Sequence, residues 1–389
     1  MQNIKKLAFI FILPLIFFSS IFAENTTSIV NEKPQPIDLQ SKIQDLNILA
    51  EEYFNIGKSL YKLGKYEEAI KNLNLAIKYK PNYADAYNYK GMVLANLGKY
   101  DEAIENYDLA IKYEFDFAEA YNNKGNSLNK LGRYQEAIEN FDLALKYNPY
   151  FAVAYNNKGS VLNNLRKYQE AIEYYNLALK YDPKYSEAYY NKGISLMSLW
   201  QHQEAIENYN LAIKYKPNYI QAYNNKGVSL MNLGQYDEAI KNYDLAIKYL
   251  HSHVTAYYNK AICFNILKKY QEAITNCDLA IKYDPNYIAT YLEKGIALRK
   301  LGKYEEAIKS YDLAIKYKSD YAESYLEKGI TLISMGKQKA AKENFSLALK
   351  YKPNLIEEYT AIIKVLRKLG NDLMAGEFEE KLKIMQDNL

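Results

Sequence analysis

Hydrophobic and polar residues follow two superimposed periods along this chain. From residue 50 onward, apolar residues recur three and four positions apart, which is the spacing of one face of an α-helix. The whole pattern then returns every 34 residues without insertion or deletion. The stretch "NLGKYDEAIENYDLAIKY" at 96–113, for example, comes back as "NLGQYDEAIKNYDLAIKY" at 232–249. The pattern predicts one helical unit that is used many times over.

Each 34-residue unit predicts two helices, at positions 2–14 and 18–31 counted from the first residue of the unit. Gly at position 15 can take a positive φ in the turn between them. Asp101 and Glu102 open a second helix and Lys112 closes it, as the helix dipole favours. Pro at position 32 ends this helix in six units. We expect nine complete units and a degenerate tenth, at 50–83, 84–117, 118–151, 152–185, 186–219, 220–253, 254–287, 288–321, 322–355 and 356–389.

Small and aromatic residues mark where these helices touch. Position 8 is Gly in every complete unit except one, which has Ala261, and positions 20 and 27 are always Ala. Position 4 is Tyr in all ten units, and the chain has 42 Tyr in total. Small residues let two helices approach closely, and the rings fill the space that is left. A single hairpin cannot bury its apolar face alone, so the sequence predicts an all-α stack of hairpins, an α-solenoid.

The repeated motif Tyr-x2-Lys-Gly-x2-Leu, then Ala-x3-Tyr/Phe, then Ala and Pro, resembles the tetratricopeptide repeat (TPR) family. The resemblance is close over 50–355 and loose over 356–389. It implies a right-handed superhelix whose first helices line a concave groove that binds protein or extended peptide. Position 7 departs from the family pattern, because it is Lys from Lys90 to Lys328; we expect its stem to pack and its amine to reach water. In the tenth unit Ile363 and Glu379 replace the Gly and the aromatic, which predicts a C-terminal cap.

The first 23 residues differ from the rest of the chain. "MQNIKK" is a basic start, an apolar run follows, and Ala23 is a small residue at a plausible cleavage point, which is the layout of a secretory signal peptide. An uncleaved anchor is the alternative, but the run is shorter than the ~20 residues of a comfortable span. We therefore expect residues 1–23 to be removed, residues 24–37 to form a flexible linker, and the array with its lead-in to occupy 38–355. Export places the protein in the periplasm, in the cell envelope or outside the cell.

Charge and candidate chemistry narrow the function. Lys and Arg number 50 against 46 Asp and Glu, so the charge gives no case for nucleic acid, or for a membrane once the leader is gone. His251 and His253 share one turn without a third ligand, and His202 is expected to be a half-buried packing residue. We find no catalytic constellation, metal set or cofactor motif and predict a protein that is not an enzyme.

Cys263 and Cys277 leave two alternatives open. They occupy the two helices of one predicted hairpin, and an exported protein permits a disulfide between them. Cys277 replaces an aromatic residue, which favours a small buried side chain instead. Trp200 likewise allows two interpretations: an exposed ring on a turn, or a binding anchor on the rim of the groove.

Asparagines at positions 5 and 6 are the candidate peptide-binding residues, because those positions face the groove in the TPR family. Position 6 is Asn in five successive units, and an amide there can both donate to and accept from a peptide backbone. The alternative is that the motif "YNNKG" was copied when the repeats duplicated and lies on a solvated face without a binding role. The candidate residues are Asn122, Asn123, Asn156, Asn157, Asn191, Asn224, Asn225 and Asn259.

A second TPR binding mode, the clamp of basic residues that holds a C-terminal carboxylate of chaperones, is missing from the sequence. Position 2 holds acidic or neutral residues such as Glu51, Asp85 and Val153, and positions 5 and 6 hold no basic residue. The predicted function is an exported, non-catalytic scaffold that binds protein or extended peptide. Two alternatives stay open: a substrate-recruiting subunit of a separate enzyme, and a self-assembling envelope protein.

Overall fold

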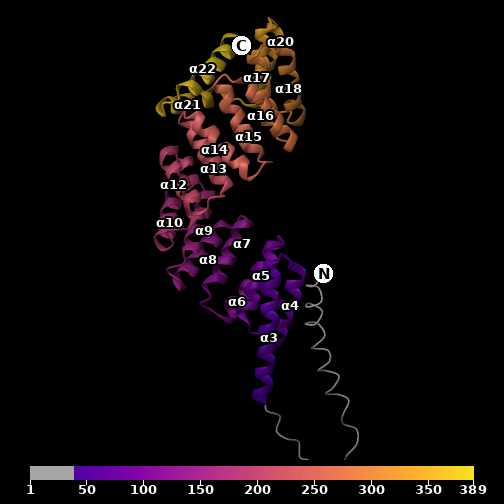
Figure 1. Ribbon diagram of the computed structural model, residues 1–389, viewed down its shortest axis with the longest axis vertical. Coiled ribbons are helices and arrows are strands. Elements are labelled where there is room, and N and C mark those ends of the chain that lie inside the picture. The colour runs from indigo at the N-terminus through magenta and orange to yellow at the C-terminus, as the bar shows by residue number, and fades with distance from the viewer. Residues whose placement is uncertain (1–38) are drawn as a thin grey trace, which may run out of the picture.

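A computed structural model describes residues 39–389, and the predicted signal peptide and linker lie outside this range. The described chain is all-helical, with helices paired into hairpins that stack into a curved solenoid (Figure 1). The helices are α3 (Leu39–Lys62), α4 (Tyr66–Tyr79), α5 (Ala84–Asn96), α6 (Tyr100–Tyr113), α7 (Ala118–Lys130), α8 (Tyr134–Tyr147), α9 (Ala152–Asn164), α10 (Tyr168–Tyr181), α11 (Ser186–Ser198), α12 (His202–Tyr215), α13 (Ile220–Asn232), α14 (Tyr236–Tyr249), α15 (Val254–Ile266), α16 (Tyr270–Tyr283), α17 (Ala289–Lys300), α18 (Tyr304–Tyr317), α19 (Ala322–Ser334), α20 (Gln338–Tyr351), α21 (Leu355–Lys368) and α22 (Asp372–Asp387). None of the helices in this range is long and apolar enough to cross a bilayer.

The turn inside each hairpin needs a residue with positive φ at position 15. Gly98 has a φ of 77° there, in the region that glycine adopts without steric cost. Three units place a side chain in the same conformation: Arg166, Trp200 and Lys268 have φ values of 60°, 61° and 60°. These three residues keep the turn geometry of the array at the cost of backbone strain.

Close packing inside each hairpin depends on position 8. The ring at position 24 lies directly against the glycine backbone, so that a Cβ on Gly227 would sit 2.5 Å from Cε1 of Tyr243. The single Ala at this position, Ala261, faces the single Cys at position 24, Cys277, and both are fully buried. The chain therefore matches the size of one residue to the size of the other.

Tyrosines at positions 4 and 30 form a second repeated contact. The two rings of a unit stack on each other in all nine complete units, for example Tyr121 on Tyr147 at 5.6 Å between ring centres. Such pairs add about 0.5–1.5 kcal/mol beyond the burial of their area. This contact explains why two exposed-looking tyrosine positions never vary.

The lysines at position 7 have partners that the sequence did not predict. In five units the Lys amine forms an ion pair with Asp at position 25 of the preceding unit, as Lys158 does with Asp142. The other four pairs have nitrogen–oxygen distances of 2.6–2.7 Å. Where the preceding unit has Asn at position 25, burial lowers the pKa of the lysine, in Lys90, Lys192 and Lys226. Charge therefore links neighbouring units in one part of the array and not in another.

The two cysteines are free and fully buried, in line with the alternative of small buried side chains and not with the disulfide. Cys263 packs in the core shared with Tyr243 of the preceding unit, whereas Cys277 packs in the core shared with Tyr311 of the following unit. The two thiols thus serve opposite faces of the same hairpin. Burial raises the pKa of the Cys263 thiol to about 12, so it stays protonated at neutral pH.

Candidate functional site

The candidate site is the inner, concave surface, which the first helices of the hairpins line. First helices of successive units, such as α5 and α7 or α15 and α17, contact one another directly, and this places them on the shorter, inner side of the curve. Near the N-terminal end this surface has an open hollow of about 460 Å³ between α3, α5 and α7. Its lining is largely polar and includes Asn123, Asn126, Asn129, Tyr61 and Lys130.

The predicted asparagines form a ladder along this surface. Each position-6 side chain is half-buried and donates a hydrogen bond to the position-5 side chain of the preceding unit. Asn157 donates to Asn122 at 2.9 Å, and Asn191 donates to Asn156 at 3.0 Å. The other three bonds join Asn123 to Asn88, Asn225 to the hydroxyl of Tyr190, and Asn259 to Asn224. The amides of the ladder therefore hold the units together as well as face the groove.

Hydrogen-bonding capacity remains on the ladder. Asn123 donates one amide hydrogen to Asn88 and accepts a bond of 3.4 Å from Asn122. An amide offers two donors and two lone pairs, so Asn123 keeps one of each. The position-5 residues Asn122 and Asn156 are only 4% and 5% exposed and serve as ladder partners inside the stack. The structure thus brings together Asn122, Asn123, Asn156, Asn157, Asn191, Asn224, Asn225 and Asn259 in one continuous row.

A second row of polar bonds runs parallel to the ladder, and the sequence reasoning missed it. Asn164 at position 13 donates to Asn129 at position 12 of the preceding unit, at 3.2 Å. Ser195, at position 10, also donates to position 12 of the preceding unit, Asn163, at 2.8 Å. Asn is frequent at positions 12 and 13, and this was the signal in the sequence. The bonding partner lies in the preceding unit, so no pattern within one unit reveals it.

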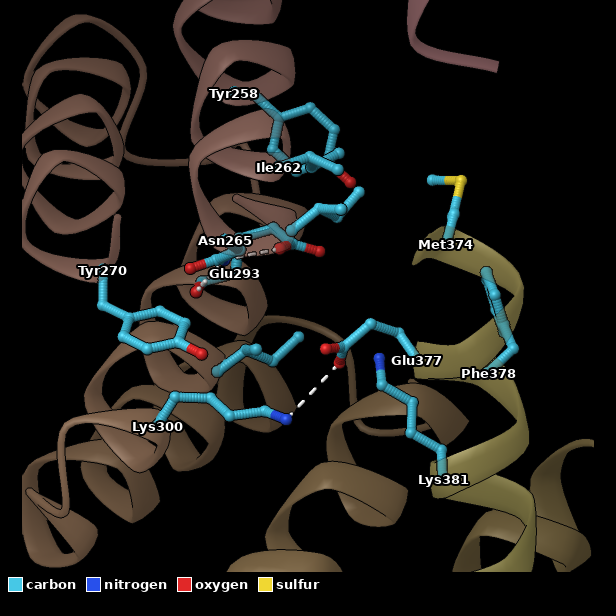
Figure 2. Close-up of a pocket in the computed structure, with 12 residues that line it drawn as sticks. Tyr258, Ile262, Asn265, Tyr270, Glu293, Lys300, Met374, Glu377, Phe378 and Lys381 are labelled. Atoms are coloured by element: carbon cyan, nitrogen blue, oxygen red, sulfur yellow. Dashed lines mark hydrogen bonds and ion pairs between the residues drawn. The ribbon is translucent and has the colours of Figure 1, made fainter. Parts of the chain in front are cut away.

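The ladder stops where the final helix begins to cover the groove. Position 6 is acidic in the eighth and ninth units, as Glu293 and Glu327, and α22 lies over both. Figure 2 shows α22 facing α15 and α17 across a small hollow, with Lys381 and Glu377 directed toward it. The inner surface therefore has an open amide half and a covered acidic half.

The other candidate residues have local roles. His253 is the N-cap of α15, and its ring nitrogen accepts a bond from the backbone N–H of Ala256. His202 is 3% exposed, more buried than expected, and burial lowers its pKa. Trp200 stays 45% exposed and touches His202 edge-on. Within residues 39–389, no three His, Cys, Asp or Glu side chains gather as a metal site would require.

Comparison with known families agrees with this architecture. A family model described as "TPR repeat" matches residues 57–98, 196–234 and 295–336. Family models described as "Tetratricopeptide repeat" match residues 84–117, 118–151, 152–185, 220–253, 254–287 and 322–355. The fold and its repeated site define a helical-repeat protein that binds other proteins. The chain belongs to the tetratricopeptide repeat family.

One solved structure supports the fold, and two others are similar over less than half of this chain. A tetratricopeptide repeat protein from Parabacteroides merdae aligns at a TM-score of 0.52 and 20% identity, over 65% of this chain and 99% of its own. The TPR protein YrrB, described as having an unusual peptide-binding site, aligns at 0.41 and 25% over 48% and 96%, and MamA at 0.38 and 29% over 41% and 93%. The comparison with curated proteins gave no match.

Proposed function

We propose that this protein is an exported, non-catalytic scaffold that binds an extended peptide segment of another protein in the amide half of its groove. Membership of the TPR family supports the coarser part of this proposal, protein–protein interaction. The finer part rests on one observation: half-buried asparagines, one per unit, form a row along the inner surface, and the first of them, Asn123, lines the hollow between α3, α5 and α7.

The proposed ligand follows from the chemistry of this row. Amides at a spacing of one per unit suit a backbone that repeats its own donors and acceptors, so the peptide is bound in extended form with broad sequence preference. The near-balance of charge argues against nucleic acid, and position 2 lacks the basic residues of a carboxylate clamp. Glu187, at that position, is paired with Lys216 of its own unit at 2.9 Å. The N-terminal leader supports export, with the mature chain free of the membrane.

A groove variant tests the proposal without disturbing the ladder. Asn126 lines the hollow but makes no ladder bond, so Asn126→Arg should fill the hollow and leave the stack intact. Gln135→Arg is the control, since it adds the same charge on an exposed face of α8, a second helix of its hairpin. Unstructured peptides would be selected from a display library against the mature chain, and their affinities measured by fluorescence anisotropy.

The expected result is that Asn126→Arg weakens the selected peptides by about tenfold or more, a loss of about 1.4 kcal/mol. Gln135→Arg should leave their affinity unchanged. Selection that yields no peptide, or peptides that bind both variants as they bind the unchanged chain, would refute the amide groove as the site. Weakening by both variants would point to charge repulsion alone.

A further inference from the structure

The last helix, α22, lies across the inner surface of the seventh to ninth units. Its N-cap residue, Asn371, donates to the backbone carbonyl oxygens of Met231 and Asn232 in the sixth unit, at 2.9 and 3.1 Å. The hydroxyl of Tyr236 donates to the side-chain oxygen of the same Asn371. From this anchor α22 runs over α15 and α19, and Figure 1 shows it folded back beside the array. The chain thus covers part of its own groove.

One face of α22 makes this contact. Its side chains toward the groove are spaced as on one helical face: Met374, Glu377, Phe378 and Lys381. This is the anchor spacing by which an amphipathic helix binds a groove. The next residues of that face, Leu382 and Met385, are buried in the core that α22 shares with α19, α20 and α21. Figure 2 shows Met374, Phe378 and Lys381 on the α22 side of the hollow, and Tyr258, Glu293 and Lys300 on the opposite side. The seventh to ninth units therefore already display the chemistry of a helix-binding surface.

Charge sits at the centre of the contact. The Lys381 amine lies 2.7 Å from Glu327, which also lies 3.0 Å from the guanidinium of Arg299, and Glu327 is only 2% exposed. Although burial opposes it, the charges of Lys381 and Arg299 hold the pKa of Glu327 below its usual range. Replacing a buried ion pair by apolar residues is often neutral or stabilising, so such a centre selects a partner more than it adds stability.

The fit beneath α22 is incomplete. A hollow of about 250 Å³ remains between α15, α17 and α22. The side-chain oxygen of Asn265 borders it, is buried, and has no hydrogen-bond partner within the described residues. Burial also raises the pKa of the neighbouring Glu293 carboxyl. Close packing and satisfied polar groups characterise a permanent core. The part of the contact at Met374, Glu377 and Phe378 is less completely packed than the part that holds Leu382 and Met385.

We infer that the acidic inner surface of the seventh to ninth units is a second docking surface, for an amphipathic helix of a partner protein that places a basic residue where Lys381 lies. In the isolated chain α22 occupies this surface and must leave before the partner binds. The surface is separate from the amide half of the groove, so the failure of either proposal leaves the other standing.

Charge-reversal variants of the full chain test the inference, with a fluorescent peptide of residues 371–389 as the probe. Lys381→Glu should release α22, because its carboxylate would face Glu327 and Glu293. Lys383→Glu is the matched control, since this exposed lysine on α22 makes the same charge change away from the groove. Lys381→Arg is a second control, since it keeps a positive charge beside Glu327.

The probe should bind the Lys381→Glu chain at least about tenfold more tightly than the unchanged chain, whose surface is occupied. Hydrogen exchange should show loss of protection in α22 and unchanged protection in the first five units. Both control variants should bind as weakly as the unchanged chain.

Three results would overturn the inference. The first is a Lys381→Glu chain whose α22 stays protected or which does not bind the probe. The second is loss of protection along the whole array, because α22 would then be an integral part of the fold. The third is a dimer of the unchanged chain in light scattering, because two copies would then exchange their α22 helices.

Discussion

Adding one methyl group to Gly227 tests the packing rule that governs every hairpin. An Ala at this position would place its Cβ 2.5 Å from Cε1 of Tyr243 and 2.9 Å from Cδ1 and Cζ. Carbon atoms in contact normally stay about 3.5–4.0 Å apart. Tyr243 is fully buried, so its ring cannot swing away into solvent. The strain must therefore be absorbed by separating α13 from α14.

The magnitude follows from two opposing effects. Ala in the interior of a helix is favoured over Gly by about 0.5–1 kcal/mol. Overpacking a tight core costs about 1–3 kcal/mol, and three contacts below 3.0 Å place this site toward the upper end. We expect Gly227→Ala to destabilise the sixth unit by about 1–2 kcal/mol. Gly376→Ala is the matched control, because no heavy atom lies within 4 Å of its added Cβ, and it should stabilise α22 by about 0.5–1 kcal/mol.

The seventh unit supplies a natural form of the compensating change. It combines Ala261 with Cys277, both fully buried. The double variant Gly227→Ala with Tyr243→Cys should therefore cost less than the sum of its two single changes, by about 0.5–2 kcal/mol. Hydrogen exchange resolved by unit is the assay, since a repeat array need not unfold in a single step. Equal effects of Gly227→Ala and Gly376→Ala, or additive costs in the double variant, would refute the reasoning.

Four further outcomes are expected. Asp142→Asn removes the partner of Lys158 and should lower the stability of that unit interface by about 0.5–1 kcal/mol in chemical denaturation, mostly at low salt. Asn157→Ala breaks a ladder bond and should cost about 0.5–1.5 kcal/mol, seen as faster exchange in both units that the bond joins. Lys268→Gly relieves a positive φ and should raise the melting temperature, by a net gain of about 0.5–1 kcal/mol. Intact-mass measurement of exported protein should find Glu24 as the first residue; retention of the leader would contradict the signal peptide.

Helix positions, hairpin turns and the tight contacts of the small residues could be predicted from the sequence, because each depends on residues within one unit. Gly at position 8 and Ala at position 20 predict a close approach of the two helices of a hairpin, whatever surrounds the unit. The groove positions of Asn123 and Asn157 followed from the register of the family. What they bond to did not, because each partner lies in the preceding unit and is chosen by the geometry of stacking.

The covered half of the groove could not be predicted for a related reason. Glu293 and Glu327 end the asparagine run at position 6, and no sequence pattern links them to Lys381 in the last helix. Only the curvature of the solenoid, accumulated over several interfaces, brings the turn after α21 to the turn after α13. Asn371 and Tyr236 meet there although 135 residues separate them.

That meeting point has a mechanical consequence. A solenoid stretches like a coil spring, since each interface between units contributes a small rotation and no single interface must break. The bonds from Asn371 to Met231 and Asn232 act as a clasp across the C-terminal coils, because they join the tenth unit directly to the sixth. A pull on the two ends of the chain would first lengthen the coils formed by the first five units, while the clasped coils moved as one stiff block until the clasp opened. The solenoid would thus have a compliant N-terminal part and a stiffer C-terminal part. The difference is due to α22, the helix that covers the groove.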